Sequence, residues 1–281
     1  MDIVASVPTY NRPELLLKNI KCLLEQTVKL KKIIIVDNAS EEDTYNILLS
    51  SGLLDKDEIL YHRLDINVGA SGGFKKAMEL AAQYNPDWIW GMDDDAFPRK
   101  DALEALVKSV DVFDINTCFW SNCDEDDLFE HEYKTVDKLI FVGFFLPVSL
   151  VKKIGYPDTR FYMYHDDTEY SNRILAANYK IVKVKNSVID HKGFNKRGDS
   201  PFTFHKFLGV NVTLLNCEGY RLYYIYRNEY YIINGGRLER MLYLKKLLLA
   251  LVKYTLYKRK SLPFVWLAFK HILSGQRGKV L

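Results

Sequence analysis

Three consecutive aspartates, Asp93, Asp94 and Asp95, follow directly on the apolar segment 88–92. Like charges packed this closely repel one another, so the chain needs a compensating partner for them. If the backbone stays extended, Asp93 and Asp95 point to one side and Asp94 to the other. Two carboxylates on one side suit Mg²⁺ or Mn²⁺, with phosphate oxygens and water as further ligands. The alternative is a solvated acidic turn that caps the next helix.

Other polar and glycine-rich segments also follow predicted strands. Asp37 ends an apolar run, where its carboxylate could accept from a ribose hydroxyl or a base imide, or instead cap a helix. The glycine-rich segment 69–73 precedes a predicted helix, whose N-terminus attracts phosphate, although it could be only a tight turn. In open α/β sheets, ligands gather at the carboxyl ends of the strands. The convergence of several unusual strand ends therefore predicts a binding site there.

The segments that must position these residues alternate between strand and helix. Residues 2–9, 31–37, 58–67 and 86–95 have strand patterns. Helical patterns lie between them, from Pro13, over 41–50 and after the glycines. This alternation predicts an α/β doubly wound sheet. The second half is less regular, with strands expected at 117–121, 138–146 and 180–189, a helix at 167–177 and helices over 237–281.

The composition is that of an ordinary globular protein. The chain has 281 residues, 48% of them hydrophobic, which is enough to bury a sizeable core. The four cysteines are scattered without metal-site spacing, and we expect them to be reduced, as in a cytosolic protein. The N-terminus lacks a basic segment followed by an apolar one, so no signal peptide is expected.

The C-terminal segment 237–281 differs from the rest in charge. It holds eleven Lys or Arg residues and one acid, whereas the preceding residues hold 28 basic and 35 acidic groups. Its longest apolar run, Leu247–Val252, is far below the roughly 20 residues that a membrane span needs. If the segment is helical, its lysines fall within an arc of about 100°. They are Lys245, Lys246, Lys253 and Lys260.

A basic amphipathic helix of this kind lies on anionic bilayers. We therefore expect a main domain over 1–236 and a basic amphipathic helical tail over 237–281 that contacts an anionic membrane surface. The alternatives are a helical pair that packs on the main domain, or an interface in a homo-oligomer. No nucleic-acid partner is expected.

Four motifs together resemble a known family. The segments VPTYNRPELLLKNIKCLLEQT, KIIIVDNAS, NVGASGGFKKAMELA and WIWGMDDDAFP, in this order, resemble the nucleotide-sugar half of inverting GT-A glycosyltransferases of family 2. The resemblance covers residues 2–235. The glycine turn and the triple aspartate most resemble bacterial galactofuranosyltransferases; related rhamnosyltransferases usually lack the double glycine before Phe74. The resemblance implies a Rossmann-like mixed sheet flanked by helices, with a C-terminal helical appendage.

The resemblance also implies which residues contact the nucleotide-sugar. The end of the first strand would hold the uridine and diphosphate, Asp37 the uracil or ribose, and Asp94 the ribose or sugar. The double glycine and the following lysine would line the pocket. The full set is Pro8, Thr9, Tyr10, Arg12, Asp37, Asn38, Gly72, Gly73, Lys76 and Asp94.

The metal ligands implied by the resemblance are Asp93, Asp95 and His191. The divalent cation on the diphosphate would be Mn²⁺ or Mg²⁺. His191 follows the predicted strand 180–189, although a lone histidine is usually structural.

The second half would supply the base and the acceptor site. FYMYHDDTEYSNRI resembles the acidic motif of the family, so Asp167 is the expected base, with Asp166 beside it. A carboxylate next to a second one has a raised pKa, as a base requires, although the same acids could instead complement a helix dipole. Phe144 and Phe145 occupy the segment that carries aromatic acceptor residues in the family. An aromatic pair of this kind could equally belong to the core.

These observations predict a metal-dependent inverting glycosyltransferase. It would move a sugar, galactofuranose in our prediction, from a UDP-sugar to a hydroxyl of a bacterial cell-surface glycan with a lipid-linked acceptor. It would act in the cytoplasm, peripherally on the inner face of the cell membrane. The alternatives are a rhamnosyl-, glucosyl- or galactosyltransferase, a nucleotidyltransferase, or a non-catalytic glycan-binding module. The segment VPTYNRPE is not the basic glycine-rich loop of a nucleotidyltransferase, and a binding module would need no nucleotide pocket.

Overall fold

The computed structural model describes residues 1–281 except 42, 124–128, 192–201, 208–209 and 218. Its contacts divide the chain into two compact units. Unit 1 comprises Met1–Thr159 and Asp166–Phe194, and unit 2 comprises Arg160–His165 and Asn195–Leu281. The second unit therefore begins well before residue 237, where the charge pattern of the sequence placed the boundary.

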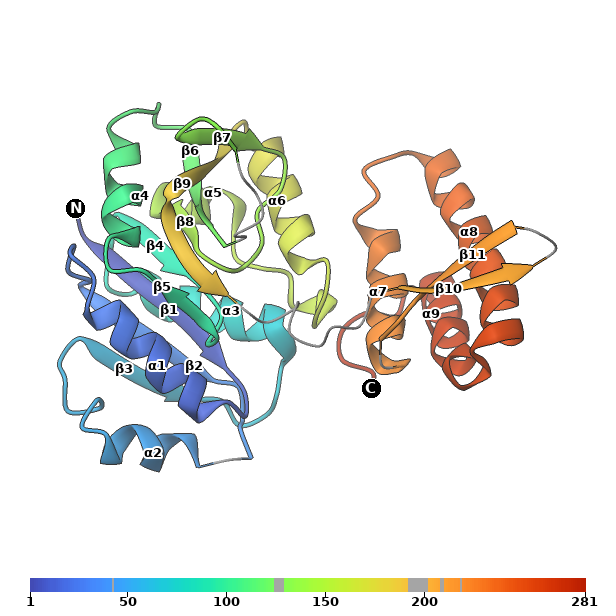
Figure 1. Ribbon diagram of the computed structural model, residues 1–281, viewed down its shortest axis with the longest axis horizontal. Helices are drawn as coiled ribbons and strands as arrows, with labels where there is room; N and C mark the ends of the chain where they lie inside the picture. The colour runs from blue at the N-terminus through green and yellow to red at the C-terminus, as the bar shows by residue number, and fades with distance from the viewer. Residues whose placement is uncertain (42, 124–128, 192–201, 208–209, 218) are drawn as a thin grey trace. The chain divides into compact units, whose positions relative to one another are not determined.

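Unit 1 is built on a nine-stranded mixed sheet (Figure 1). The strand order is β3-β2-β1-β4-β8-β6-β9-β5, and β7 pairs with β9. The first four are parallel, whereas β8 is antiparallel to both of its neighbours. The expected mixed sheet is confirmed. The strands are β1 (Ile3–Thr9), β2 (Lys32–Asp37), β3 (Ile59–Arg63), β4 (Trp88–Gly91), β5 (Ala96–Pro98), β6 (Thr117–Asn122), β7 (Tyr133–Val136), β8 (Phe144–Pro147) and β9 (Lys180–His191).

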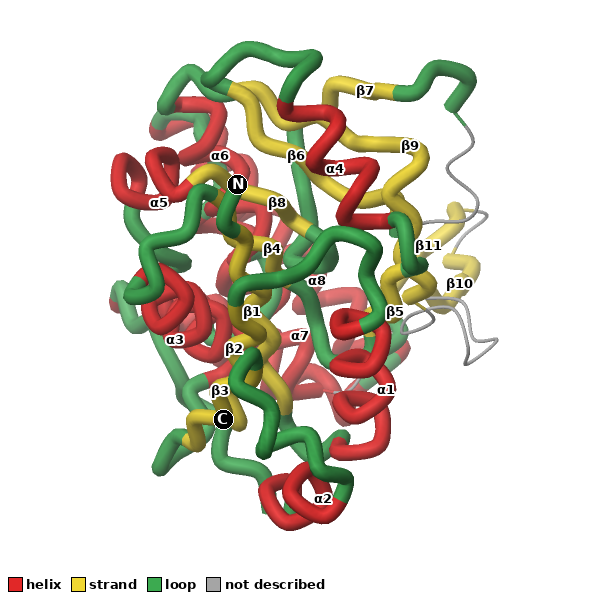
Figure 2. The backbone as a smooth tube through the Cα atoms, turned by 90° about the vertical axis from the view of Figure 1, so that its left-hand side faces the viewer, coloured by secondary structure: helices red, strands yellow, loops and turns green. Residues whose placement is uncertain are grey.

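Helices cover both faces of the sheet. Figure 2 shows α3, α5 and α6 on one side of the strands, and α1 and α4 on the other. Alternation along β1 explains the two layers, because Ala5 packs into the core with Leu16 of α1, whereas Val4 packs with Phe74 of α3. The helices are α1 (Pro13–Leu24), α2 (Thr44–Ser50), α3 (Gly69–Ala82), α4 (Ala102–Val110), α5 (Val148–Ile154) and α6 (Asp166–Ala176).

Unit 2 has its own core, which is rich in tyrosine. Most of its buried side chains come from three helices, among them Tyr223, Tyr254 and Val265, and Tyr162 and Leu214 complete it. In the part of the chain that the structure describes, no helix is both long and apolar enough to cross a membrane. The elements are β10 (Phe202–Phe207), β11 (Val210–Leu215), α7 (Gly219–Tyr231), α8 (Arg237–Tyr257) and α9 (Leu262–Ser274), with short 3₁₀ turns at Thr159–Phe161 and Arg259–Ser261.

Two buried side chains of α7, Arg227 and Asn228, hold the segment Arg160–His165. Arg227 donates to the carbonyls of the first two residues of the segment, and its guanidinium lies over the rings of Tyr223 and Tyr224. The side-chain amide of Asn228 donates to three carbonyl oxygens of the same segment. They belong to Phe161, Met163 and Tyr164 and lie at 2.7–2.9 Å. The segment that leads into α6 is thus fixed to α7.

Candidate active site

The carboxyl ends of β2, β1 and β4 lie side by side. The parallel register pairs Thr9 with Asp37, and Ser6 with Gly91. Continued by three residues, the second register places Thr9 beside Asp94, and the Thr9 hydroxyl donates to the Asp94 carboxylate at 2.7 Å. The strand ends that the sequence singled out therefore meet at one edge of the sheet.

The three aspartates occupy a turn between β4 and β5. The expectation of an extended backbone there is wrong, since the Ala96 amide donates back to the Asp93 carbonyl at 3.2 Å. The turn reverses the chain so that β5 pairs antiparallel with β9, with Ala96 opposite His191. This pairing brings the His191 imidazole to 3.1 Å from Asp95. One ligand atom each from Asp93, Asp95 and His191 lies within 4.8 Å of the others.

A buried asparagine, Asn19 of α1, supports this turn. Its side-chain amide donates to the carbonyls of Asp93 and Ala96. Asn19 is not among the site residues expected from the sequence. The available signal was its place on the apolar face of α1 among Leu16, Ile20 and Leu23, where a polar residue needs a partner. The helix therefore fixes the backbone from which the aspartates project.

Burial of the carboxylates, followed by their mutual repulsion at Asp93, dominates the electrostatics of the turn. Burial, together with the charges of Asp95 and Asp94, raises the pKa of Asp93. Burial also raises the pKa of Asp94, to about 6, although the Thr9 hydroxyl and the Arg12 charge oppose this. These carboxyls therefore favour a positive partner.

Arg12 and His191 supply positive charge to the turn. One guanidinium nitrogen of Arg12 lies 3.3 Å from Asp94 and 2.9 Å from Asp95. Although burial opposes it, the hydrogen bond and charge of His191 hold the pKa of Asp95 below its ordinary value. The same hydrogen bond raises the pKa of His191. Arg12 was expected to hold diphosphate, and in this structure its side chain, half exposed, binds the aspartates.

The donor set fits the expected divalent cation. Asp93 and Asp95 offer carboxylate oxygens and His191 an imidazole nitrogen, all partly exposed and close together. Carboxylate oxygens suit Mg²⁺ and Mn²⁺, and a bound cation would favour the ionised form of Asp93, which burial and the neighbouring carboxylates oppose. The cluster could therefore hold either ion.

Asp37 and Asn38 lie buried at the end of β2. Asp37 accepts from the Ser40 amide at 2.8 Å and from the Tyr61 hydroxyl at 2.5 Å. Burial and then the bond to Asp37 raise the pKa of Tyr61, a residue that the sequence analysis did not single out. Asn38 accepts from the Val68 amide, and its own amide donates to the Gly69 carbonyl at 3.0 Å. Asn38 therefore positions the start of α3. The expectation that the glycine segment 69–73 precedes the helix is wrong, because α3 begins at Gly69 and includes these residues.

The two glycines expected to line the pocket serve close packing. Both Gly72 and Gly73 are buried. A Cβ at Gly73 would lie 3.0 Å from the Pro8 Cβ, so the missing side chain lets α3 approach the end of β1. Tyr10 is exposed beyond β1, and Lys76 is partly buried on α3.

The acidic pair Asp166 and Asp167 begins α6. Asp166 is 6% exposed, and burial, followed by the charge of Asp167, raises its pKa to about 7. Asp167 is more exposed; its carboxylate accepts from the Thr168 amide and lies 3.4 Å from the Lys138 ammonium. Both acids thus lie in the first turn of a helix, where they can complement the helix dipole. Asp166 also has a pKa suited to a general base.

Comparison with known proteins identifies the family. The model of the family described as "Glycosyl transferase family 2" matches residues 5–170. This match covers more than half of the chain, including most of β1, the aspartate turn and the start of α6. The chain belongs to glycosyl transferase family 2.

The chain is also similar to named glycosyltransferases. The chain is 23% identical over 266 residues to galactofuranosyltransferase GlfT1 of Mycobacterium tuberculosis, a match that covers 86% of this chain and 85% of that protein. Among solved structures, the mannosyltransferase PcManGT from Pyrobaculum calidifontis, in complex with GDP-Man and Mn²⁺, superimposes with a TM-score of 0.63 at 15% identity, over 98% of this chain and 87% of that one. GalNAc-T7 with UDP, GalNAc and Mn²⁺ gives a TM-score of 0.58 at 14% identity, over 68% of this chain and 44% of that one. The chain is a glycosyltransferase with the GT-A fold.

The assignment of Phe144 and Phe145 to an acceptor site needs correction. Both rings are fully buried, on opposite faces of β8. Phe145 stacks on Trp88 at 4.5 Å between ring centroids, and Phe144 fills the space above Gly91, where a Cβ would collide with its ring. Neither ring can present a face to a sugar, so this pair belongs to the core of the glycosyltransferase.

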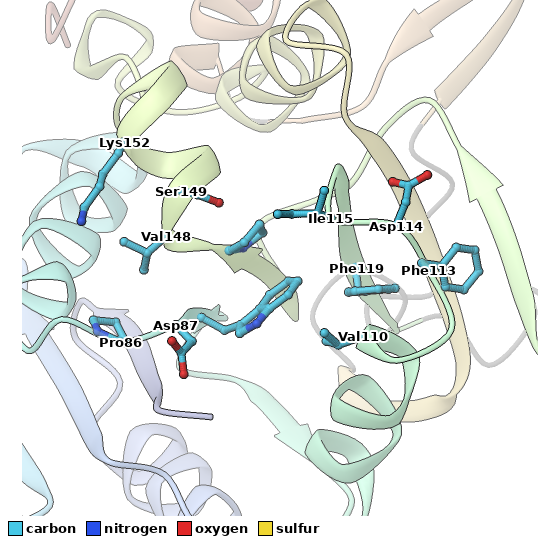
Figure 3. A pocket seen from close by; sticks show the side chains of 12 residues that line it. Pro86, Asp87, Val110, Phe113, Asp114, Ile115, Phe119, Val148, Ser149 and Lys152 are labelled. Atoms are coloured by element: carbon cyan, nitrogen blue, oxygen red, sulfur yellow. The ribbon is translucent and has the colours of Figure 1, made fainter.

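A cavity of about 640 Å³ lies away from the aspartate turn (Figure 3). Trp88, the first residue of β4, lines it, whereas the aspartates lie beyond the opposite end of that strand. Phe113 and Phe119 contribute to its apolar lining, and Asp114 and Lys152 are among its polar lining residues. The cavity is therefore separate from the strand ends that would bind the donor.

Proposed function

We propose that this family 2 glycosyltransferase transfers a sugar, galactofuranose, from its UDP donor to a hydroxyl of a bacterial cell-surface glycan, with inversion. The observation that carries the proposal is the cluster of Asp93, Asp95 and His191 at the sheet edge where Thr9 and Asp37 also end their strands. A nucleotide diphosphate needs this combination of cation ligands and polar strand ends.

The donor would lie across the carboxyl ends of β2, β1 and β4. Asp37 would accept from the uracil or ribose, and Thr9 and Asp94 would face the ribose and sugar. Mn²⁺ or Mg²⁺ held by Asp93, Asp95 and His191 would supply positive charge to the departing diphosphate. Arg12, which is half exposed, would turn from the carboxylates to the phosphates as a second cation.

The acidic pair at the start of α6 would activate the acceptor. Asp167 would take the proton of the acceptor hydroxyl as its oxygen attacks the anomeric carbon. The attack comes from the face opposite the diphosphate, so the new bond forms as the sugar–phosphate bond breaks and the configuration inverts. Buried Asp166, with its pKa near 7, would keep the pair protonated at lower pH.

Two observations support galactofuranose over other sugars. The relative GlfT1 is named a galactofuranosyltransferase, and the segment NVGASGGF has the double glycine expected for that class. Rhamnosyl-, glucosyl- and galactosyltransferases are the alternatives within the fold. We further propose that the acceptor is lipid-linked, and that the enzyme works peripherally on the inner face of the cell membrane.

The test is release of UDP from a donor panel, with Mn²⁺ or Mg²⁺ and a galactofuranose-containing glycan acceptor. We expect the fastest release from UDP-galactofuranose, and UDP to compete with the donor better than dTDP. Faster turnover of dTDP-rhamnose would replace the sugar assignment. Tight UDP binding without turnover of any donor would instead favour a non-catalytic module. Anomeric analysis of the product by NMR tests inversion.

A further inference from the structure

Helix α8 has two apolar faces. One is buried in the core of unit 2 through Tyr243, Leu247, Ala250 and Tyr254, whose spacing of four, three and four residues follows the helical repeat. The opposite face is apolar as well, but it is exposed to solvent. Its residues are Leu238, Met241, Leu242, Leu248, Leu249, Val252 and Leu256, with exposed fractions of 48–65%.

These seven residues form one continuous stripe. At 100° per residue they fall within an arc of about 120°, centred opposite the buried face. From Leu238 to Leu256 the stripe runs for about 27 Å along the helix axis. Scattered exposed leucines are normal, but a stripe of this length on one helix indicates an interaction surface.

Basic residues lie within and beside the stripe. On the same helical projection, exposed Lys245 lies near its middle, and Arg237 and Lys253 lie at its two edges. The single acid of α8, Glu239, projects to the other side of the helix. Lys246, which the sequence placed in the basic arc, is engaged with Glu229 at 2.6 Å, and Lys260 lies beyond the end of α8. The exposed apolar face therefore carries positive charge and no carboxylate of its own helix.

We propose that this face of α8 lies on the surface of a bilayer that contains anionic lipid. The leucines would enter the boundary between headgroups and acyl chains, while Lys245 and its basic neighbours bind lipid phosphates. A second copy of the chain fits less well, because a symmetric contact would bring Lys245, Arg237 and Lys253 against the same residues of the partner. This face of α8 would thus be the surface through which the proposed peripheral enzyme contacts the membrane. Only the lipid-linked nature of the acceptor rests on the proposed function.

Co-sedimentation of the full chain with vesicles tests the proposal. Wild type should bind vesicles with about 30% anionic lipid at least tenfold more tightly than neutral ones. The variant Leu242→Glu/Leu249→Glu should lose at least about tenfold of this binding, because the glutamates remove apolar contact and repel phosphate. The matched control is Ile66→Glu/Val112→Glu, which changes equally exposed apolar residues of unit 1 and should bind like wild type.

A second variant separates charge from apolar contact and from misfolding. Lys245→Glu/Lys253→Glu keeps every leucine and should lose the preference for anionic over neutral vesicles. Wild-type binding by both variants would overturn the proposal. A dimer interface at this face would also overturn it. In that case light scattering would find wild type dimeric and Leu242→Glu/Leu249→Glu monomeric, and wild type would not bind vesicles. UDP release with a water-soluble acceptor should be unchanged in all variants, so a failed donor assay counts against the proposed function and not against this surface.

Discussion

At the scale of single residues, Asp93 is the sharpest test of the metal site. Asp93→Asn keeps the size of the side chain but removes the charged ligand atom that lies near Asp95 and His191. We expect the rate of UDP release to fall by at least about a hundredfold, since a lost metal contact costs several kcal/mol at the transition state. Chelator should lower wild-type turnover to a similar level.

A matched control for Asp93→Asn is Asp111→Asn, which removes an exposed carboxylate beyond α4. That variant should turn over donor like wild type. Mn²⁺ or Mg²⁺ should restore the chelated wild type but leave Asp93→Asn slow at every concentration. Full activity of Asp93→Asn, or of wild type in excess chelator, would contradict the metal assignment.

The acidic pair of α6 predicts the pH dependence of the rate. Because the pKa of Asp166 is about 7, the pair carries its full negative charge only above that pH. UDP release should therefore rise with pH and level off above about 7. If Asp167 is the base, Asp167→Asn should release UDP slowly at every pH. Asp166→Asn should stay active, but its rate of UDP release should no longer rise near pH 7. A rise near 7 that persists in Asp166→Asn would assign it to another group.

Asp166 also predicts how stability depends on pH. Its pKa is raised from 3.8 in the unfolded reference to about 7, so the folded chain holds this proton more tightly than the unfolded chain. Stability contributed by the neutral form is lost as the pH rises from about 4 to about 7. Relative to wild type, Asp166→Asn should therefore gain free energy of unfolding between about pH 5 and pH 8, on the order of a few kcal/mol. Urea unfolding of both proteins at the two pH values measures this gain. If the free energies of unfolding of variant and wild type differ equally at both pH values, Asp166 ionises normally.

Residues at strand ends could be located from the sequence because their chemistry interrupts an apolar pattern. Asp93 and Asp37 end buried strands, so their meeting at one sheet edge followed from the parallel order. Asn19 and Tyr61 lie inside regular elements, and their bonds to this edge depend on packing that no local pattern contains. Phe144 and Phe145 belong to the core, because alternation along β8 points the two rings into different layers.

At the scale of elements, the strands with strong periodicity were predictable and their irregular connections were not. The first four strands and the helices between them lie close to where the sequence predicts them, although β3 and β4 end earlier than expected and α3 already begins at Gly69. The turn at Asp93–Asp95 and the short strand β5 depend on pairing with β9, a partner almost a hundred residues away. That pairing also places His191, so the third candidate ligand came from the family resemblance and not from local pattern.

The bond network of Asn228 gives a prediction for the segment before α6. Asn228 donates to three carbonyls of Arg160–His165, in which Tyr162, Tyr164 and His165 have positive φ angles. Asn228→Ala leaves these carbonyls without that donor, and the free energy of unfolding should fall by about 1–3 kcal/mol. Hydrogen exchange should rise first in this segment.

The control for Asn228→Ala is Gln83→Ala, an exposed amide after α3 that should leave stability within about 0.5 kcal/mol of wild type. Denaturant unfolding followed by circular dichroism measures both variants. If Asn228→Ala is as stable as the control, the network is not what holds the segment.

At the scale of the whole molecule, charge predicted a basic helical tail but not the boundary of the unit that contains it. The sequence of α7 has a helical pattern that fits either unit. Its buried residues Leu222 and Tyr223 lie in one core with Tyr254 of α8 and Val265 of α9. Which neighbour a helix packs against is a property of the folded chain, so the change in charge at residue 237 marks a difference in surface, not the edge of a core.

Truncation tests this boundary directly. A chain of residues 1–236 keeps α7 but lacks α8, α9 and the Gly278 carbonyl that accepts from buried Arg227. It should therefore bind a hydrophobic dye strongly and be cleaved rapidly within 202–231, because an apolar face of α7 is left in water. A chain of residues 1–194 retains the sheet and both of its layers, and it should resist protease in its described strands and bind little dye. If instead 1–236 is as resistant as the full chain, α8 and α9 are an appendage on a complete domain, as the charge pattern alone suggested.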